Sequence, residues 1–277
     1  MKNQFILTAL FITIQLSAQS SVDTIYSNNQ KLAVNLETIN EESISFKYPG
    51  ETVLNMLYKN VVQKIIHKSG RVEIFNNRSS FKVVKSALDW EKVSITSIEN
   101  EVRGLNKINE VSSKAVGTSI FSNMDQVKQR AHDKIKMKSA MYGANTVFLS
   151  EERSQMKTGD ILIGGTKTNT TISGVAYSNK VLDYSIFTTL LGGKPEFALV
   201  KKAAFKNNSM ELATFDYQNV PVEILTHYQE EGIIYVNIRI KGLKQDVFRV
   251  VYFDNSTITL LFEDSKYINN LILEVSK

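Results

Sequence analysis

Hydrophobic residues recur at every second position along much of the chain, which is the period of a β-strand with one buried face. Within residues 20–80, alternating runs such as 32–36 and 44–48 are separated by turn sequences, including Pro49-Gly50 and Ser69-Gly70. This pattern predicts a short antiparallel meander. A unit of this size is typical of a small SH3-like β module, so we expect a barrel-like N-terminal domain at residues 20–80.

The same alternation returns in residues 203–277. Asp254-Asn255-Ser256 provides a tight turn between two apolar runs, 247–253 and 258–262. We therefore expect a C-terminal β-meander. One predicted strand turns four apolar residues to the same face: Ile234, Val236, Ile238 and Ile240.

A helical period replaces the strand period in residues 125–142. Ser122, with Asp125 three positions later, resembles a capping box, and Gly143 stands where a left-handed residue ends many helices. These signals predict a helix over 125–142, packed on a sheet in an α+β domain at residues 88–180. Its apolar stripe consists of Met124, Val127, Ala131, Ile135 and Tyr142.

Three other segments have weaker patterns. Residues 103–124 are rich in small residues and predict a loop or a weak helix, and residues 181–191 predict a buried strand or an inter-domain segment. Residues 157–170 predict a hairpin or mobile loop. Together the patterns indicate an α+β, strand-dominated fold with a small antiparallel β-barrel-like module, a sheet with one packed helix, and a C-terminal β-meander.

The first 19 residues have the layout of a secretory signal peptide. Lys2 precedes an apolar run, Phe5–Leu16, and the small polar stretch Ser17–Ser20 follows. The apolar run is well short of the roughly 20 residues that span a membrane. We therefore expect residues 1–19 to be removed and the mature chain to be exported to the periplasm or outer membrane, or secreted.

Composition narrows the chemistry that is open to the chain. It contains no cysteine, which excludes disulfides, thiolate metal ligands, a cysteine nucleophile and a cysteine-linked lipid anchor. The net charge of +5 is mild and does not indicate a nucleic-acid partner. After residue 19 the apolar runs are too short for a spanning helix, so we expect no transmembrane helix in the mature chain.

The chain has three histidines, His67, His132 and His227, which fall in separate predicted segments. None has a second histidine or a glutamate at helical ligand spacing, and His132 and Asp133 point to different helix faces. The sequence therefore predicts neither a metal site nor a Ser-His-Asp triad.

Other charged or glycine-rich groups have ordinary explanations. The glycines at 159, 164 and 165 precede Lys167, but this spacing departs from a phosphate-binding P-loop. Lysines spread around the predicted helix, and those at 201, 202 and 206 are typical of solvated surfaces. Adjacent carboxylates lie at predicted turns or strand ends, namely Glu41-Glu42, Glu151-Glu152 and Glu230-Glu231. We predict no catalytic, cofactor-binding or metal-binding residues from these patterns.

The helix and the strand predicted after it contain a recognisable series of residues. The series is Ala131, Ile135-Lys136, Ser139-Ala140, Gly143-Ala144-Asn145 and Val147. It resembles the helix-to-strand signature of the RcsF-like and YbjQ-like bacterial domains, and Gly174–Tyr177 stands where those families place a closing strand. The resemblance covers residues 90–177 and implies an α+β domain with a role in the cell envelope. RcsF-type sensors carry cysteines, which this chain lacks.

These observations favour a non-catalytic, exported envelope protein that acts as a binding or adaptor module. The expected partner is an envelope protein or a cell-wall component, bound through strand edges or loops. Two alternatives stay open: a hydrolase whose carboxylates are dispersed in the sequence, and a carrier of a small ligand or a metal.

Overall fold

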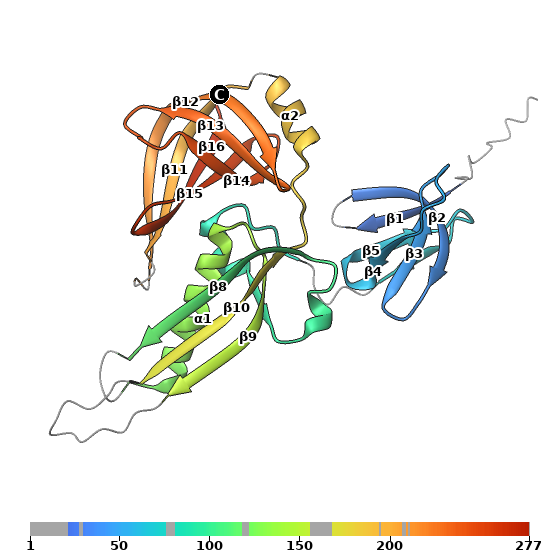
Figure 1. Cartoon of the computed structure of the whole chain (residues 1–277), viewed down its shortest axis with the longest axis horizontal. Coiled ribbons are helices and arrows are strands. Elements are labelled where there is room, and N and C mark those ends of the chain that lie inside the picture. Colours follow the sequence, from blue (N-terminus) through green and yellow to red (C-terminus); the bar gives the residue numbers. More distant parts are fainter. Residues whose placement is uncertain are drawn as a thin grey trace, which may run out of the picture. The chain divides into compact units, whose positions relative to one another are not determined.

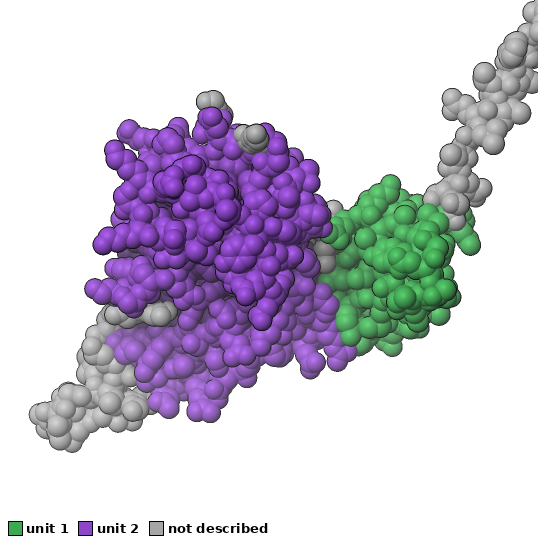
Figure 2. Space-filling model, turned by 45° about the horizontal axis from the view of Figure 1, so that its top comes forward, with its two compact units in different colours: residues 1–77 green, residues 78–277 purple. Residues whose placement is uncertain are grey.

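A computed structural model gives the structure of the chain in two compact units, residues 1–77 and 78–277 (Figure 2). The α+β, strand-dominated fold class predicted from the sequence is confirmed (Figure 1). Within the described part of the chain, no helix combines the length and the apolar character needed to cross a membrane. The described residues are 22–27, 30–75, 81–117, 122–155, 168–193, 195–206, 209 and 211–276.

The first unit is an antiparallel sheet with the strand order β4-β3-β2-β1-β5-β6. The first half of β2 pairs with β1 and its second half with β3. The buried carboxylate of Asp23 accepts the backbone N–H groups of Leu36 at 3.2 Å and Lys68 at 2.8 Å, which ties three strand regions together. The strands are β1 (Asp23–Ser27), β2 (Gln30–Ile39), β3 (Ser43–Lys47), β4 (Asn55–Tyr58), β5 (Val62–Ile66) and β6 (Val72–Ile74), with the 3₁₀ helix η1 at Lys59–Val61.

The second unit begins with a sheet in the order β7-β9-β10-β8, in which β7 and β9 are parallel and the other pairs antiparallel. Helix α1 packs on this sheet through Val127, Ala131 and Ile135, as its apolar stripe predicts. The elements are η2 (Ala87–Lys92), β7 (Ser94–Thr96), η3 (Glu99–Glu101), β8 (Asn106–Val116), α1 (Met124–Met141), β9 (Thr146–Gln155) and β10 (Asn169–Ser178).

Both ends of α1 are defined by specific residues. Asn123, rather than the predicted Ser122, caps the N-terminus: its side-chain oxygen accepts the backbone N–H of Asp125 at 2.7 Å. Gly143 follows the C-terminus with a φ of +80°, which confirms the predicted left-handed residue. Its position is also tight, because a β-carbon there would lie 2.6 Å from the carbonyl oxygen of Val251.

Strands β11 to β16 form a closed antiparallel barrel (Figure 1). The predicted C-terminal meander therefore has its first and last strands paired with each other, which removes the sheet edges there. Helix α2 contributes Phe187 to the barrel core, where the centre of its ring lies 5.1 Å from the centre of the Phe253 ring. The elements are α2 (Tyr184–Gly192), β11 (Phe197–Lys206), β12 (Leu212–Glu230), β13 (Ile233–Ile240), β14 (Val247–Phe253), β15 (Thr257–Glu263) and β16 (Tyr267–Val275).

Two local predictions are wrong. Residues 103–124 include the long strand β8, whose inward positions hold the small residues Ser113 and Ala115; α1 lies so close that the Ser113 hydroxyl donates to the Ala131 carbonyl at 2.7 Å. Residues 181–191 contain most of α2, because the Asp183 side chain accepts the N–H groups of the first helical turn.

The sheet β7-β9-β10-β8 with α1 packed on it, which we call the helix-bearing sheet, shares one apolar core with the barrel. Met141 and Tyr142 at the end of α1 belong to the same cluster as Val251, Leu261 and Ile268, on the outer face of the barrel. The sequence predicts separate domains at 88–180 and 203–277, whereas the structure has residues 78–277 as one compact unit.

Candidate functional site

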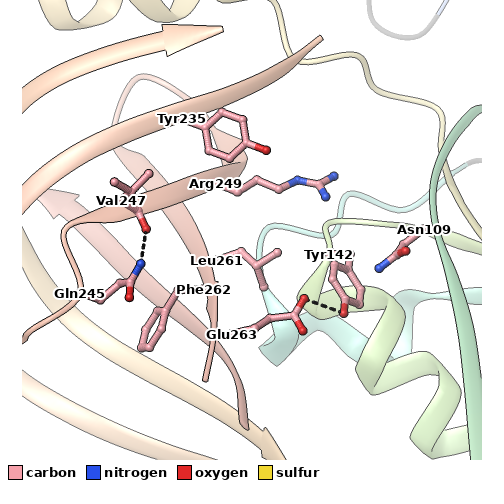
Figure 3. Close-up of a pocket in the computed structure, with 9 residues that line it drawn as sticks. All are labelled: Asn109, Tyr142, Tyr235, Gln245, Val247, Arg249, Leu261, Phe262 and Glu263. Atoms are coloured by element: carbon pink, nitrogen blue, oxygen red, sulfur yellow. Dashed lines mark hydrogen bonds between the residues drawn. The ribbon is translucent and has the colours of Figure 1, made fainter. Parts of the chain in front are cut away.

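A hollow of about 300 Å³ lies where the outer face of the barrel meets the end of α1 (Figure 3). We call it the Arg249 hollow. The barrel contributes residues from β13, β14, β15 and the β13–β14 loop, and the helix-bearing sheet contributes one residue from β8 and one directly after α1. The lining residues are Asn109, Tyr142, Tyr235, Gln245, Val247, Arg249, Leu261, Phe262 and Glu263.

Strand register aligns the barrel side of the hollow. Tyr228 on β12 pairs with Tyr235 on β13, which pairs with Arg249 on β14. Arg249 in turn pairs with Leu261 on β15, and Leu261 with Asn270 on β16. Directly paired residues place their side chains on the same face of a sheet, so these five form a row across the outer face of the barrel.

Arg249 is the most unusual member of this row. Its side chain is half-buried, yet its guanidinium makes no hydrogen bond or ion pair with any other described residue. Burial lowers the pKa of Arg249, while the nearby Tyr235, Tyr142 and Glu263 raise it. An arginine stays protonated in proteins, so the hollow contains a fixed positive charge whose fork of N–H donors has no acceptor among the described residues.

Glu263 and Tyr142 form the opposite side of the hollow. The Tyr142 hydroxyl donates to Oε1 of Glu263 at 3.0 Å, the lower dashed line in Figure 3. Burial raises the pKa of Tyr142 far above its usual range, and the negative charge of Glu263 adds to this effect. Tyr142 is therefore a neutral hydrogen-bond donor at physiological pH, which is unsuited to act as a base.

A second cation lies close to Glu263. Burial lowers the pKa of Lys138, one helical turn before Tyr142, while the charge of Glu263 raises it. Lys138 makes no ion pair within 4.0 Å among the described residues, and neither does Arg249. Two cations are thus within electrostatic reach of one carboxylate: Arg249 lines the hollow together with Glu263, and Lys138 lies outside the lining.

The lining of the hollow contains none of the three histidines, and each has its own neighbours. In the first unit, His67 Nε2 lies 3.2 Å from Glu73. His132 Nε2 contacts Glu152 at 3.0 Å, and His227 Nδ1 lies 3.1 Å from the Tyr184 hydroxyl. Among the described residues, no group of three or more histidine, aspartate or glutamate side chains could hold a metal ion.

The other groups considered from the sequence also lie outside the hollow. Lys201 pairs with Asp216 at 3.1 Å, and the Lys202 ammonium lies 5.5 Å from the centre of the Phe262 ring. Glu151 and Glu152 pair with cations on the surface of the helix-bearing sheet. The predicted signal peptide at 1–19 and the glycines at 159, 164 and 165 with Lys167 lie outside the described residues.

The sequence analysis did not predict that any of the residues lining the hollow form a functional site. Alternation along β13 and β14 places Tyr235 and Arg249 on the outward face of their strands. No pattern relates them to Tyr142 or to Asn109, which lie more than 90 positions earlier. Only the packing of the helix-bearing sheet on the barrel brings these side chains together.

Comparisons with models of known protein families, with curated protein sequences and with solved structures gave no match.

Proposed function

We propose that this chain is a non-catalytic binding module of the bacterial cell envelope, which recognises an acidic group on a protein or cell-wall partner through the Arg249 hollow. The observation that carries this proposal is the half-buried guanidinium of Arg249, which has no hydrogen-bonding or ion-pairing partner among the described residues. Buried charges in proteins are normally paired. A ligand carboxylate would supply the missing partner, because its two oxygens match the arginine fork.

The surrounding charges support an acidic ligand group. The negative charge of Glu263 raises the pKa of both Arg249 and Lys138, although burial lowers the pKa of each, and neither cation has an ion pair in the described part of the chain. Glu263 already accepts a hydrogen bond from the Tyr142 hydroxyl (Figure 3). An incoming anion would therefore find in Arg249 a guanidinium that has no partner among the described residues.

The chemistry of the lining residues favours binding over hydrolysis. Most glycoside hydrolases act through a pair of carboxylates. Glu263 is the one carboxylate among the residues that line the hollow, and the high pKa of Tyr142 keeps its proton in place. The envelope location is our expectation from the leader at residues 1–19 and from the resemblance of residues 90–177.

An in-cell crosslinking experiment tests the proposal. A photo-crosslinking residue is placed at Gln245, which is exposed at the hollow, and adducts are isolated from the envelope fraction. We expect an adduct that is lost with Arg249→Met, which keeps the length of the side chain but removes its charge. The matched control is Arg239→Met on β13, an exposed arginine that pairs with Glu223 at 2.6 Å, and it should leave the adduct unchanged.

Mass spectrometry of the recovered protein tests the location at the same time. A mature N-terminus at Gln19 or Ser20 in the envelope fraction is expected. An intact leader on cytosolic protein, or an adduct that persists in Arg249→Met, would contradict the proposal.

A further inference from the structure

We infer that the acidic group bound at the Arg249 hollow belongs to a sugar ring, so that the ligand is an acidic glycan such as a uronic-acid polymer. This inference rests on the proposed function and names the class of ligand for the same site. The observation behind it is a pair of stacked tyrosines directly beside Arg249 in the cross-strand row.

The tyrosine pair offers the apolar surface that sugar recognition needs. The rings of Tyr228 and Tyr235 are nearly parallel, with an angle of 19° between them and 5.3 Å between their centres. Tyr228 is 39% exposed although it is a large aromatic residue. A pyranose ring has an apolar face of C–H groups that packs on such rings, and tyrosine provides this area at a low cost in conformational entropy.

The polar lining matches the edge of a sugar ring. In Figure 3 the Tyr235 hydroxyl and the Arg249 guanidinium extend in the same direction from neighbouring strands. The amides of Asn109 and Gln245 also line the hollow. Gln245 already donates one N–H to the Val247 carbonyl, and the Asn109 oxygen accepts the Glu110 N–H, but each amide keeps a further donor and a lone pair for a hydroxyl group. Arg249 would bind the ring carboxylate while these amides bind the hydroxyls. A hollow of about 300 Å³ is at the small end of ligand pockets, which suits one ring at a time.

An acidic peptide fits this site less well. Extended peptides commonly add to a sheet through backbone hydrogen bonds at a free edge. At the hollow there is no such edge, because Tyr235, Arg249 and Leu261 each have a paired strand on both sides. Recognition here has to come from side chains, and these combine aromatic rings with hydroxyl-binding amides.

The test is a calorimetric titration of the whole mature chain with matched probes. The acidic glycan probes are tetragalacturonate and a hyaluronan tetrasaccharide, which differ in ring configuration. The methyl ester of tetragalacturonate keeps the rings without the charge, and tetraglutamate keeps the charge without the rings. We expect at least one acidic glycan to bind about tenfold or more tightly than both the ester and the peptide.

Variants separate the contribution of the rings from that of the charge. Arg249→Met should weaken glycan binding about tenfold or more, and Tyr228→Leu about threefold to tenfold. The matched control is Tyr217→Leu, because Tyr217 lies on the same strand, is 37% exposed and does not line the hollow. It should bind as the unmodified chain does. Thermal melting of each variant checks that it is folded.

The outcomes distinguish this inference from the proposed function. Tetraglutamate binding as tightly as the glycans, with loss in Arg249→Met, would overturn the glycan assignment and leave the acidic-group site standing. Failure of both acidic glycans to bind would also overturn it. An effect of Tyr217→Leu equal to that of Tyr228→Leu would refute the role of the tyrosine pair. Failure of the proposed function itself is read separately, from the Gln245 adduct.

Discussion

At the scale of single residues, Arg249 shows the effect of burial on a charged side chain, and Gly143 shows the effect of backbone conformation and close packing. A strand pattern predicts that Arg249 faces outward, but not that it lies half-buried without a partner among the described residues. Gly143 is predictable as a helix terminator, since its left-handed conformation is a local property. Its contact with Val251, about 110 positions later, is not predictable from local sequence.

Replacing Gly143 by alanine separates these two effects. Gly143 and Gly232 both have a φ of +80°, but a β-carbon at Gly232 would meet nothing within 4 Å. Gly232→Ala should cost about 1–2 kcal/mol of unfolding free energy, the usual penalty for a left-handed residue with a side chain. Gly143→Ala should cost on the order of 3–4 kcal/mol, because the contact with the Val251 carbonyl adds a packing penalty. Urea denaturation of both variants measures the difference, and equal losses would show that the contact is unimportant.

At the scale of elements, α1 and strand β13 follow their hydrophobic periods closely, while β8 and α2 do not. The inward side chains of β8 nearest the Ala131 turn of α1, Ser113 and Ala115, are small because the helix packs close to them, so this part of the strand lacks the large apolar residues that reveal a buried face. The apolar run before β11 looks like a strand by composition, yet the Asp183 cap begins a helix there. In both elements tertiary packing or a cap outweighs the apolar pattern.

The turn between β14 and β15 depends on one carboxylate, Asp254. Its Oδ1 accepts the N–H groups of Ser256 and Thr257, each at 2.9 Å. Its Oδ2 accepts from the Lys85 ammonium and the Tyr252 hydroxyl, each at 2.8 Å. Burial would raise the pKa of Asp254, but these hydrogen bonds outweigh it and hold the pKa well below its usual range.

This lowered pKa predicts a pH dependence of stability. A carboxyl whose pKa is lower in the folded state stabilises the fold above its unfolded pKa of about 3.9, and the contribution is lost as the pH falls from there toward the folded pKa. Asp254→Asn should therefore be less stable by about 1–2 kcal/mol at pH 7, with a smaller difference at about pH 2. Asp216→Asn, which alters an exposed pair with Lys201, is the control and should change little. Denaturation curves at the two pH values test this, and a constant difference would contradict it.

At the scale of the whole molecule, the defining feature is the packing of the helix-bearing sheet on the outer face of the barrel within residues 78–277. Asn270 connects the two. Its side chain is fully buried; its oxygen accepts the backbone N–H of Ala87, and its amide donates to the Met141 carbonyl, each at 2.9 Å. The Met141 carbonyl is one of those that the end of a helix leaves unpaired.

Replacing Asn270 by leucine should weaken this connection. Two buried backbone groups would lose their partners, at a cost of about 2–5 kcal/mol of unfolding free energy. The control is Asn237→Leu on the outer face of β13, where the side-chain amide donates to the Thr226 hydroxyl and to no other described residue, and it should change stability by about 0.5 kcal/mol or less. Thermal and urea unfolding compare the two variants. A similar small loss in both would show that the connection does not depend on Asn270.

The sequence alone determined the strand-dominated fold class, the position of α1 and the shared face of Ile234, Val236, Ile238 and Ile240 on β13. These are local properties, set by the period of apolar residues and by turn and cap chemistry. Tertiary structure alone decided that the C-terminal meander closes into a barrel, that the helix-bearing sheet packs on its outer face, and that Asn109 and Tyr142 face Arg249 across a hollow. Such contacts depend on which faces of distant elements fit together. The residue types at these positions also occur on ordinary protein surfaces, so the local sequence does not reveal the contacts.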